Sequence, residues 1–477
     1  MIEGYAEMDA TALAALVARG EVTPDELLDS ALEATEALNP KLNAVVLIQE
    51  SVARAAICAG LPRGPLHGVP FLIKDLGCEA VDFPSHNGSR LFMNTRYSRD
   101  SAIFERIRGT GCVPFARTTS PEGGIGPATE AAVYGGPTRN PWDLDRTSGG
   151  SSGGSGAAVA AGIVPAAHGS DGGGSVRIPA SSCGLFGFKP TRARLPDGPF
   201  AGEGWAGMAI DGFLTRSVRD TALLLDACEG ADPGAPYWAP PLGRGYAASI
   251  SRPPRRLRVA LCETTLTGAP VHADCRAAAH EAAKLLSSLG HHVEHARPEV
   301  DTEPMMRAWT DIVACGTALS IGKALKGRPL GPDEIEPVSR SAIAHAATIR
   351  GTRYLEAVGI VHAYGRQMAG FFEDWDILLT PTLAEPPAKI GRFGHSRDDY
   401  VAFRTGPDGV FAYSPYTAAF NATGQPAASV PLHMNAQGLP IGIHLAARFG
   451  ADEELISLCA ELELAAPWAQ RRPPLHA

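Results

Sequence analysis

Ser148-Gly-Gly-Ser-Ser-Gly-Gly-Ser-Gly156 is the first of two glycine- and serine-rich clusters near the middle of the chain, and Gly169-Ser-Asp-Gly-Gly-Gly-Ser-Val-Arg-Ile-Pro179 is the second. Glycines at this density let several backbone N–H groups converge on one point, because no Cβ blocks unusual backbone conformations or close approach. A serine at the end of such a run, Ser175, can present its hydroxyl beside N–H donors suited to an oxyanion. The pattern therefore predicts acyl-transfer chemistry at Ser175.

The overall composition is that of a globular chain able to form a large core. Its 477 residues are 45% hydrophobic and 19% charged, which permits extensive apolar burial. The net charge is −9, and no long run of lysine or arginine is present, which argues against nucleic acid as a partner. The apolar residues 157–167 are interrupted by Gly162 and Pro165 and are too few to cross a bilayer, so we expect a buried helix there. We therefore expect neither a nucleic-acid nor a membrane partner.

Cysteine and histidine positions bear on the cellular compartment and on metal binding. Nine cysteines are scattered without a Cys-x-x-Cys pair, which is typical of neither a disulfide framework nor a zinc site. The first residues lack the basic and apolar regions of a secretory signal, so we expect a cytoplasmic protein. His291, His292 and His295 lie close together, but a strand bordered by solvent accounts for them, and we expect no metal ion.

Local patterns predict helices that alternate with strands. Thr23-Pro24-Asp25-Glu26 supplies an N-cap, a proline at the first helical position and a capping-box glutamate. Residues 257–262 and 291–295 have strand patterns on either side of an Ala/Leu-rich helix at 275–289, which makes a βαβ unit. Other predicted elements are strands at 44–48, 69–73 and 376–379, a mainly helical region at 301–372 and a surface connection at 228–256. The chain is therefore expected to have an α/β fold.

The glycine- and serine-rich clusters have three other interpretations. A flexible linker has this composition, but the flanking residues are apolar. A phosphate-binding loop would need a following Gly-Lys-Ser/Thr, which neither cluster has. Residues 149–153 match the Gly-x-Ser-x-Gly nucleophile elbow, but that motif follows a strand, and Asn140-Pro-Trp-Asp-Leu-Asp-Arg-Thr147 precedes it here. All three interpretations are less favoured than acyl transfer.

Seven segments in order carry a family pattern: Gly68–Leu76, Thr118–Glu122, Ser148–Gly156, Gly169–Ala180, Gly187–Thr191, Gly424–Pro431 and Gly438–Gly442. On these segments the chain resembles the amidase-signature hydrolases along nearly its whole length. The resemblance implies an α/β/α sandwich with a mixed, twisted central sheet. It also implies a single domain over 1–477, made of an N-terminal helical segment (1–60), a catalytic core (61–230), a variable helical region with the substrate pocket (231–372) and C-terminal core elements (373–477).

The same resemblance implies a catalytic triad. Ser175 is the expected nucleophile, Ser151 the bridging serine after a cis peptide bond from Gly150, and Lys74 the base. The chemistry is consistent with these roles, since a serine hydroxyl is a weak nucleophile until a positioned base removes its proton. A lysine can act as that base only when it is neutral, and burial beside Phe71, Leu72 and Ile73 is expected to lower its pKa.

The glycines before the nucleophile are the expected oxyanion donors. The resemblance assigns this role to the N–H groups of Gly172, Gly173 and Gly174, together with that of Ser175. Asp171 and Arg177 would brace the loop. The family usually has threonine where this chain has Gly172, and we expect the change to loosen the loop or widen the pocket.

Pocket residues are assigned on weaker matches. Family members use the segment Glu122-Gly-Gly-Ile-Gly126 at the edge of the acyl pocket, which suggests Gly124 and Ile125 there, in a roomy pocket. Cys315 loosely matches a pocket cysteine of family enzymes that act on nylon-type cyclic dimers.

The expected function is that of a serine amidohydrolase without cofactor. It would cleave a small non-peptide amide, or a related anilide, cyclic amide or carbamate, through an acyl-enzyme on Ser175. The alternatives are the amidase-like subunit of a tRNA-dependent amidotransferase, which the acidic charge disfavours, and a non-catalytic binding protein. The sequence leaves the oligomeric state open, a homodimer included.

Overall fold

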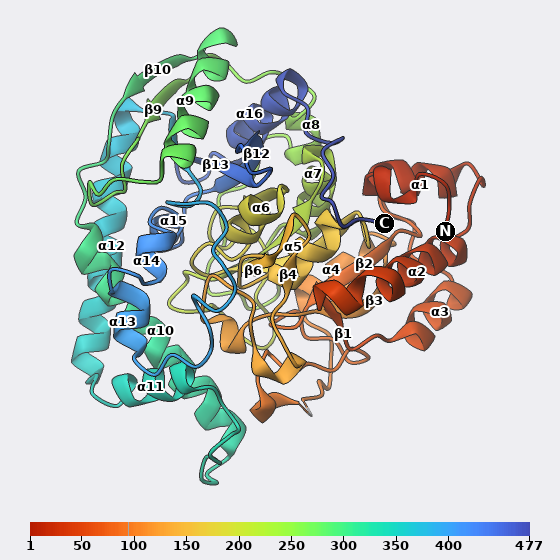
Figure 1. Cartoon of the computed structure of the whole chain (residues 1–477), viewed down its shortest axis with the longest axis horizontal. Helices are drawn as coiled ribbons and strands as arrows, with labels where there is room; N and C mark the ends of the chain where they lie inside the picture. The colour runs from red at the N-terminus through yellow and green to blue at the C-terminus, as the bar shows by residue number, and fades with distance from the viewer. Residues whose placement is uncertain (94) are drawn as a thin grey trace.

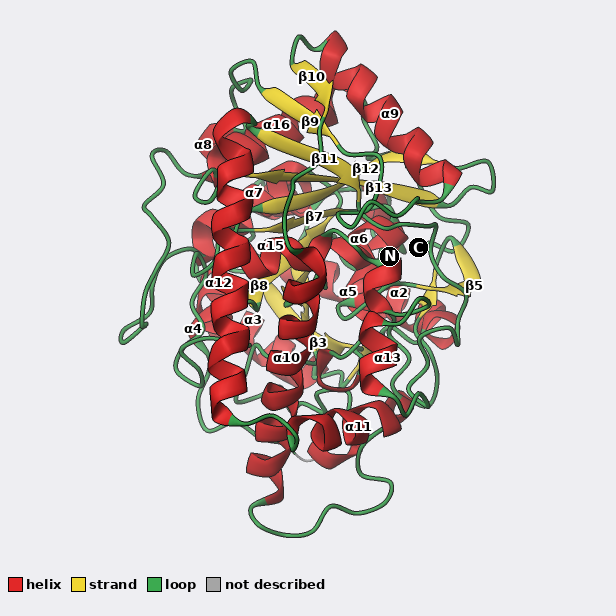
Figure 2. Ribbon diagram, turned by 90° about the vertical axis from the view of Figure 1, so that its left-hand side faces the viewer, coloured by secondary structure: helices red, strands yellow, loops and turns green. Residues whose placement is uncertain are grey.

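The protein is described here by a computed structural model that covers residues 1–93 and 95–477. Its strands are β1 Val45–Val46, β2 Pro70–Lys74, β3 Val113–Thr118, β4 Arg139–Asn140, β5 Asp143–Thr147, β6 Ala166–Asp171, β7 Phe186–Lys189, β8 Ile210–Thr215, β9 Arg258–Leu261, β10 His292–His295, β11 Ile377–Pro381, β12 Ala427–Met434 and β13 Pro440–Ala447. Eleven of them form one sheet in the order β1-β3-β2-β6-β8-β7-β12-β13-β11-β9-β10, and β4 pairs with β5. The sheet lies in the interior of the molecule (Figure 2).

The sheet is mixed, as predicted. Strand β2 is parallel to β3 and β6, and β9 is parallel to β10 and β11. The central strands β8, β7, β12 and β13 pair antiparallel. The expected α/β class with a mixed central sheet is therefore confirmed.

Sixteen helices surround the sheet in the described part of the chain. They are α1 Ala10–Ala18, α2 Pro24–Leu42, α3 Glu50–Ala59, α4 Ala102–Gly109, α5 Gly153–Ala160, α6 Arg177–Cys183, α7 Val218–Cys228, α8 Tyr246–Ser249, α9 Ala273–Ser288, α10 Thr302–Leu325, α11 Pro337–Ala346, α12 Gly351–Asp374, α13 Tyr400–Thr405, α14 Val410–Tyr413, α15 Thr417–Thr423 and α16 Asp452–Ala465. Helices α1 to α3 (red in Figure 1) lie at the opposite end of the molecule from α10 to α12. No helix among the described residues has the length and apolar character needed to cross a membrane.

Two local predictions can be compared directly with the structure. The capping box at the start of α2 is present: Thr23 Oγ1 accepts from the Glu26 N–H (3.2 Å), and a Glu26 carboxylate oxygen accepts from the Thr23 N–H (2.8 Å). The βαβ unit is also present, because β9 and β10 are parallel and α9 connects them. Gly290 ends the connection with a φ of 90°, which favours glycine.

The apolar stretch after the first glycine- and serine-rich cluster differs from its prediction. The sequence places a buried helix near 157–167, whereas α5 begins inside the cluster at Gly153 and ends at Ala160. Its first turn needs glycine because a Cβ on Gly153 would lie 2.3 Å from Thr129 Oγ1. The residues after it enter β6, so the cluster serves as the first turn of a buried helix.

The predicted histidine group has a simple structural role. His291 pairs with Glu461 (2.8 Å), His292 with Glu294 (2.7 Å) and His295 with Glu263 (3.0 Å). The three side chains therefore face three different carboxylates and do not converge.

Candidate active site

The site lies where β2 and β6 end. These strands are parallel neighbours, with Leu72 opposite Ala167, so their carboxyl ends meet at the same edge of the sheet. Lys74 is the last residue of β2, and the loop after β6 carries Ser175 into α6. Topology therefore brings together residues that are a hundred positions apart in sequence.

Lys74 is a fully buried lysine that contacts two serines. Its Nζ donates to Ser151 Oγ (2.6 Å) and to Ser170 Oγ (2.9 Å). Burial lowers the pKa of Lys74 from its usual value near 10.5 to about 7, although the charges of Asp211 and Asp171 oppose this shift. A substantial fraction of the amine is therefore neutral near pH 7 and able to accept a proton.

Ser151 follows a cis peptide bond from Gly150, as the resemblance implied. A Cβ on Gly150 would lie 2.7 Å from the backbone nitrogen of Ala128, so the turn admits only glycine there. Gly124 also lies close to this turn, because its Cβ would be 3.5 Å from Ser151 Oγ and 2.8 Å from a Leu76 methyl group. The backbone around Ser151 is thus closely packed on two sides.

Ser175 is half-buried and lines the main cavity of the molecule, which has a volume of about 1160 Å³. Ser151, Ser170 and Gly172 line the same cavity. The carbonyl of Ser175 accepts from the N–H of Ser152 (3.2 Å), the residue after Ser151. Ser151 and Ser175 therefore line one cavity, and Lys74 lies behind its wall in contact with Ser151.

The oxyanion loop corrects one sequence prediction. The N–H of Gly174 donates to Asp171 Oδ1 (2.7 Å) and is already used inside the protein. The N–H groups of Gly172, Gly173 and Ser175 have no acceptor among the residues the structure describes. Gly174 is therefore not retained as a predicted oxyanion donor, and the prediction now rests on the N–H groups of Gly172, Gly173 and Ser175.

Asp171 and Arg177 form a buried pair behind this loop. Arg177 donates to both carboxylate oxygens of Asp171 (2.9 and 2.8 Å) and to Asn421 Oδ1 (2.7 Å). Asp171 also accepts from the N–H of Val176 (3.2 Å). Burial tends to raise the pKa of Asp171, but Arg177 and Asn421 outweigh that effect and hold the pKa well below its usual range. The ionised carboxylate thus ties the loop to α6 and α15.

The side chain of Trp205 explains why the loop has glycine at 172. A Cβ on Gly172 would lie 2.4 Å from the Trp205 ring, and a Cβ on Gly316 would lie 2.8 Å from it. The indole also packs edge-on against Trp309, with ring centroids 5.7 Å apart. The expectation that Gly172 loosens the loop or widens the pocket is therefore wrong, because an indole occupies the space that a threonine side chain would need.

Two of the three predicted pocket residues do not line a cavity that contains Ser175. Gly124 does, but Ile125 points into a small hydrophobic cluster and is 4% exposed. Gly316 and Thr317 line the main cavity, whereas their neighbour Cys315 does not. These corrections have one cause: adjacent residues in a helix or a turn point in different directions, and sequence alone did not fix which one faces the cavity.

From the sequence, no role at the site was assigned to several residues that the structure places there. Ser170 is a second acceptor for Lys74, and His168 Nδ1 accepts from the Lys74 backbone N–H (3.3 Å). His168 Nε2 in turn hydrogen-bonds to Asp211 (3.0 Å). Ser170 and His168 lie on alternate positions of β6 directly before the glycines, so a period-two pattern would have suggested Ser170. Asp211 and Trp205 come from a later segment and carry no local signal.

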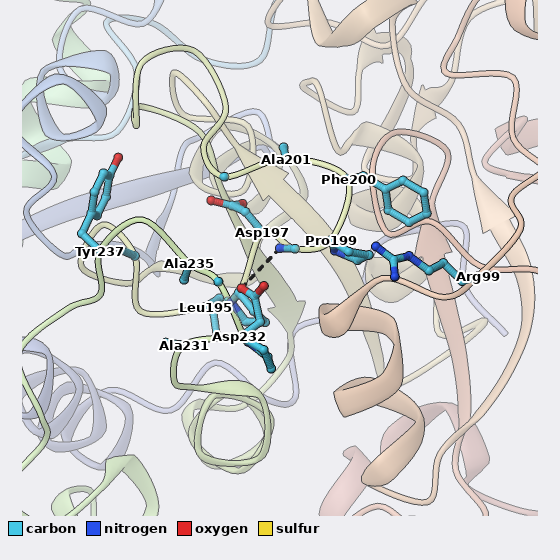
Figure 3. A pocket seen from close by; sticks show the side chains of 16 residues that line it. Arg99, Leu195, Asp197, Pro199, Phe200, Ala201, Ala231, Asp232, Ala235 and Tyr237 are labelled. Carbon is cyan, nitrogen blue, oxygen red and sulfur yellow. Dashed lines mark hydrogen bonds between the residues drawn. The ribbon is translucent and has the colours of Figure 1, made fainter.

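A second cavity of about 430 Å³ adjoins the main one. The two share Pro196, Asp197, Phe200 and Ala201 as lining residues. Figure 3 shows Asp197 near Asp232, which accepts from the Gly198 N–H (3.3 Å). Burial and the charges of Asp211 and Asp232 raise the pKa of Asp197 to about 8. This wall therefore carries a carboxyl group that is largely protonated at neutral pH.

Comparison with known proteins agrees with this geometry. The family model named Amidase matches residues 26–456. A 6-aminohexanoate-cyclic-dimer hydrolase from Paenarthrobacter ureafaciens is 38% identical over 98% of this chain and 96% of its own length. A solved structure of 6-aminohexanoate cyclic dimer hydrolase complexed with substrate has a TM-score of 0.93 at 37% identity and covers 99% of this chain and 100% of that one. A bacterial aryl acylamidase structure has a TM-score of 0.87 at 30% identity, with 97% of both chains covered. The chain therefore belongs to the amidase signature family and is an amidase, a hydrolase that acts on carbon–nitrogen bonds.

Proposed function

We propose that this amidase cleaves a small non-peptide amide through an acyl-enzyme on Ser175, with Ser151 and Lys74 as the proton-transfer groups. The observation that carries the proposal is the buried Lys74 amine, 2.6 Å from Ser151 Oγ, with its pKa lowered to about 7. A lysine in this state can accept a proton at neutral pH, and Ser151 connects it to the cavity that Ser175 lines.

Acylation begins when Ser175 Oγ attacks the amide carbonyl carbon. Ser175 gives its proton to Ser151, and Ser151 gives its own to the neutral Lys74 amine. The resulting oxyanion accepts from the N–H groups of Gly172, Gly173 and Ser175, each worth about 3 kcal/mol in the transition state. Lys74 then returns the proton through Ser151 to the leaving nitrogen, the C–N bond breaks and the amine departs.

Deacylation reverses these roles. A water molecule gives a proton through Ser151 to Lys74 and attacks the ester carbonyl on Ser175. Collapse of the second oxyanion breaks the ester bond, and the proton returns to Ser175 Oγ. The product is a carboxylic acid, and every step uses only protein groups and water.

The substrate class is inferred from the cavity and from the relatives. The main cavity has a volume of about 1160 Å³, which accommodates a small organic amide. The similar proteins are named for a cyclic amide dimer and for aryl acylamides. A cyclic amide, an anilide or a carbamate therefore fits the proposal. We also propose that 1–477 form one domain, because the strands of the large sheet extend from β1 to β13.

The test is amine release from an aliphatic amide, an anilide, a cyclic amide dimer and an aryl carbamate. Ser175→Ala should lower kcat at least about a thousandfold, while Ser251→Ala, an exposed serine far from the site in sequence, should have no effect. Turnover that survives Ser175→Ala would contradict the nucleophile assignment. If the folded protein turns over none of these compounds and instead purifies with a partner subunit or tRNA, the amidotransferase alternative replaces the proposal.

A further inference from the structure

Arg404 in α13 is a buried cation next to the nucleophile. Its side chain is 2% exposed, and its Nε and Nη2 have no acceptor among the described residues. It lines a narrow cavity that also contains Ser175, Gly173 and Trp205. An arginine stays charged at neutral pH, and a buried charge without a partner is costly. Packing alone therefore does not explain why a charged arginine is buried at position 404.

The neighbouring carboxylate pairs with other residues, and the neighbouring Tyr400 hydroxyl donates elsewhere but keeps lone pairs that can accept from Arg404. The Tyr400 hydroxyl donates to the backbone oxygen of Thr310 (3.0 Å). Asp311, on the adjacent helix α10, pairs with His345 and with Arg353, each at 2.8 Å. Burial lowers the pKa of Arg404, and Tyr400 is the one titratable neighbour that opposes this effect. No carboxylate in the described part of the chain pairs with Arg404.

Aromatic rings surround the guanidinium, and among the rings of Trp309, Tyr400 and Phe403 only Tyr400 carries an oxygen that can accept from it. Its carbon lies 4.8 Å from the centre of the Trp309 ring and 5.5 Å from that of Tyr400. Such cation–π contacts stabilise the charge without using the N–H groups. Arg392 is the contrasting case, since it also lies over two aromatic rings but pairs with Glu385 (2.6 Å).

A second donor without an acceptor lines the same cavity. The indole N–H of Trp309 is buried and has no partner among the described residues. The cavity volume is about 20 Å³, the space of about one water-sized group. Arg404 and Trp309 thus offer unused N–H groups at a cavity wide enough for an oxygen atom, next to Ser175.

We propose that this narrow cavity binds a carboxylate oxygen of the substrate, so that the enzyme prefers amides that carry a carboxylate. The inference rests on the proposed function, because it places the carboxylate on a molecule that reacts at Ser175. A guanidinium and an indole N–H together supply charge-assisted hydrogen bonds to such an oxygen. The substrate carboxylate then forms the ion pair with Arg404 that no carboxylate of the described residues forms.

The test compares matched substrates. Glutaric acid mono-para-nitroanilide carries a carboxylate, and its primary-amide analogue has nearly the same shape without the charge. A second pair moves the carboxylate to the amine side: an acetylated ω-amino acid and its primary amide. Wild-type kcat/KM should favour the carboxylate by at least about tenfold in one of the two pairs, mainly through KM.

The preference should depend on Arg404. Arg404→Met should bring the ratio of the two kcat/KM values close to one, and Arg404→Lys should keep part of it. Arg392→Met is the matched control and should keep the wild-type ratio. An equal kcat/KM within both wild-type pairs, or a preference that Arg404→Met leaves unchanged, would overturn the proposal.

Calorimetric titration of the wild-type protein with glutarate and with glutaramide requires neither turnover nor a variant. Glutarate should bind at least about tenfold more tightly, and equal binding of the two, or none, would overturn the proposed site. If glutarate binds in this way but no amide is hydrolysed, the proposed function fails and the anion site stands. If Ser175-dependent hydrolysis occurs with no preference for a carboxylate, the anion site fails and the function stands.

Discussion

Lys74 and Lys189 are two buried lysines in similar places with different surroundings. Each is the last residue of a strand in the large sheet, β2 or β7. Burial lowers the pKa of both to about 7. Lys74 donates to two serine hydroxyls at the main cavity, whereas Lys189 donates to the backbone oxygen of Pro190 (2.8 Å). A lowered pKa therefore reflects mainly burial and does not by itself mark a catalytic group, and only the hydroxyl partners make Lys74 a candidate base.

The largest expected difference between the two lysines is in activity. Lys74→Met should lower kcat at least about a thousandfold, because no other basic group among the described residues hydrogen-bonds to Ser151. Lys189→Met should lower it less than about tenfold, because Lys189 lines neither cavity that contains Ser175. Steady-state kinetics on one anilide, with circular dichroism as a control for folding, measures both. Equal losses would mean that Lys74 has no special role.

A second difference separates stability from activity. Both lysines have a pKa near 7 in the folded chain and near 10.5 when unfolded. Between these values the unfolded chain binds more protons, so the free energy of unfolding rises as pH increases from 7. Lys189→Met should reduce this rise by about 2 kcal/mol between pH 7 and pH 9.

Urea denaturation of wild type and Lys189→Met at the two pH values measures that effect. The difference between the two proteins isolates Lys189 from all other titrating groups. An identical pH dependence in both would show that Lys189 keeps an ordinary pKa in the folded chain.

A third expected effect, similar in size to the second, concerns the loop that carries Gly172. Gly172→Thr should cost about 1–3 kcal/mol of unfolding free energy, because its Cβ would lie 2.4 Å from the Trp205 ring. Adding Trp205→Ala should recover part of this cost. Gly322→Thr is the control, since a Cβ on Gly322 meets nothing within 4 Å. Additive costs for Gly172→Thr and Trp205→Ala would contradict the direct contact.

The sequence predicted the parts of the site that lie in contiguous motifs. Ser151, Ser175 and the pair Asp171–Arg177 lie in the two glycine- and serine-rich clusters and Lys74 in an apolar strand, and their roles, which the family resemblance implies, stay predictions. The βαβ unit and the start of α2 followed from periodicity and capping. The βαβ unit and the start of α2 depend on interactions between residues near one another in sequence, which is why one sequence was enough to predict them.

The remainder depends on contacts between distant segments. Trp205 reaches Gly172 from another loop, and Arg404 reaches the Ser175 cavity from α13. The use of the Gly174 N–H by Asp171 depends on the direction of one carboxylate. Ile125 and Cys315 were predicted to line the pocket, but the residues that do line it are their neighbours Gly124, which was also predicted, and Gly316. No local pattern reports which side of a turn or helix faces a cavity.

The central claim is that Lys74 acts as a neutral base, and the pH dependence of single-turnover acylation tests it most directly. The rate of para-nitroaniline release should rise about tenfold per pH unit below pH 6 and level off above the Lys74 pKa of about 7. The same profile should be found for Lys189→Met, a variant that lacks the second buried amine but keeps Lys74. A rate that is independent of pH across this range, or a midpoint that moves when Lys189 is replaced, would contradict the assignment of Lys74 as the base.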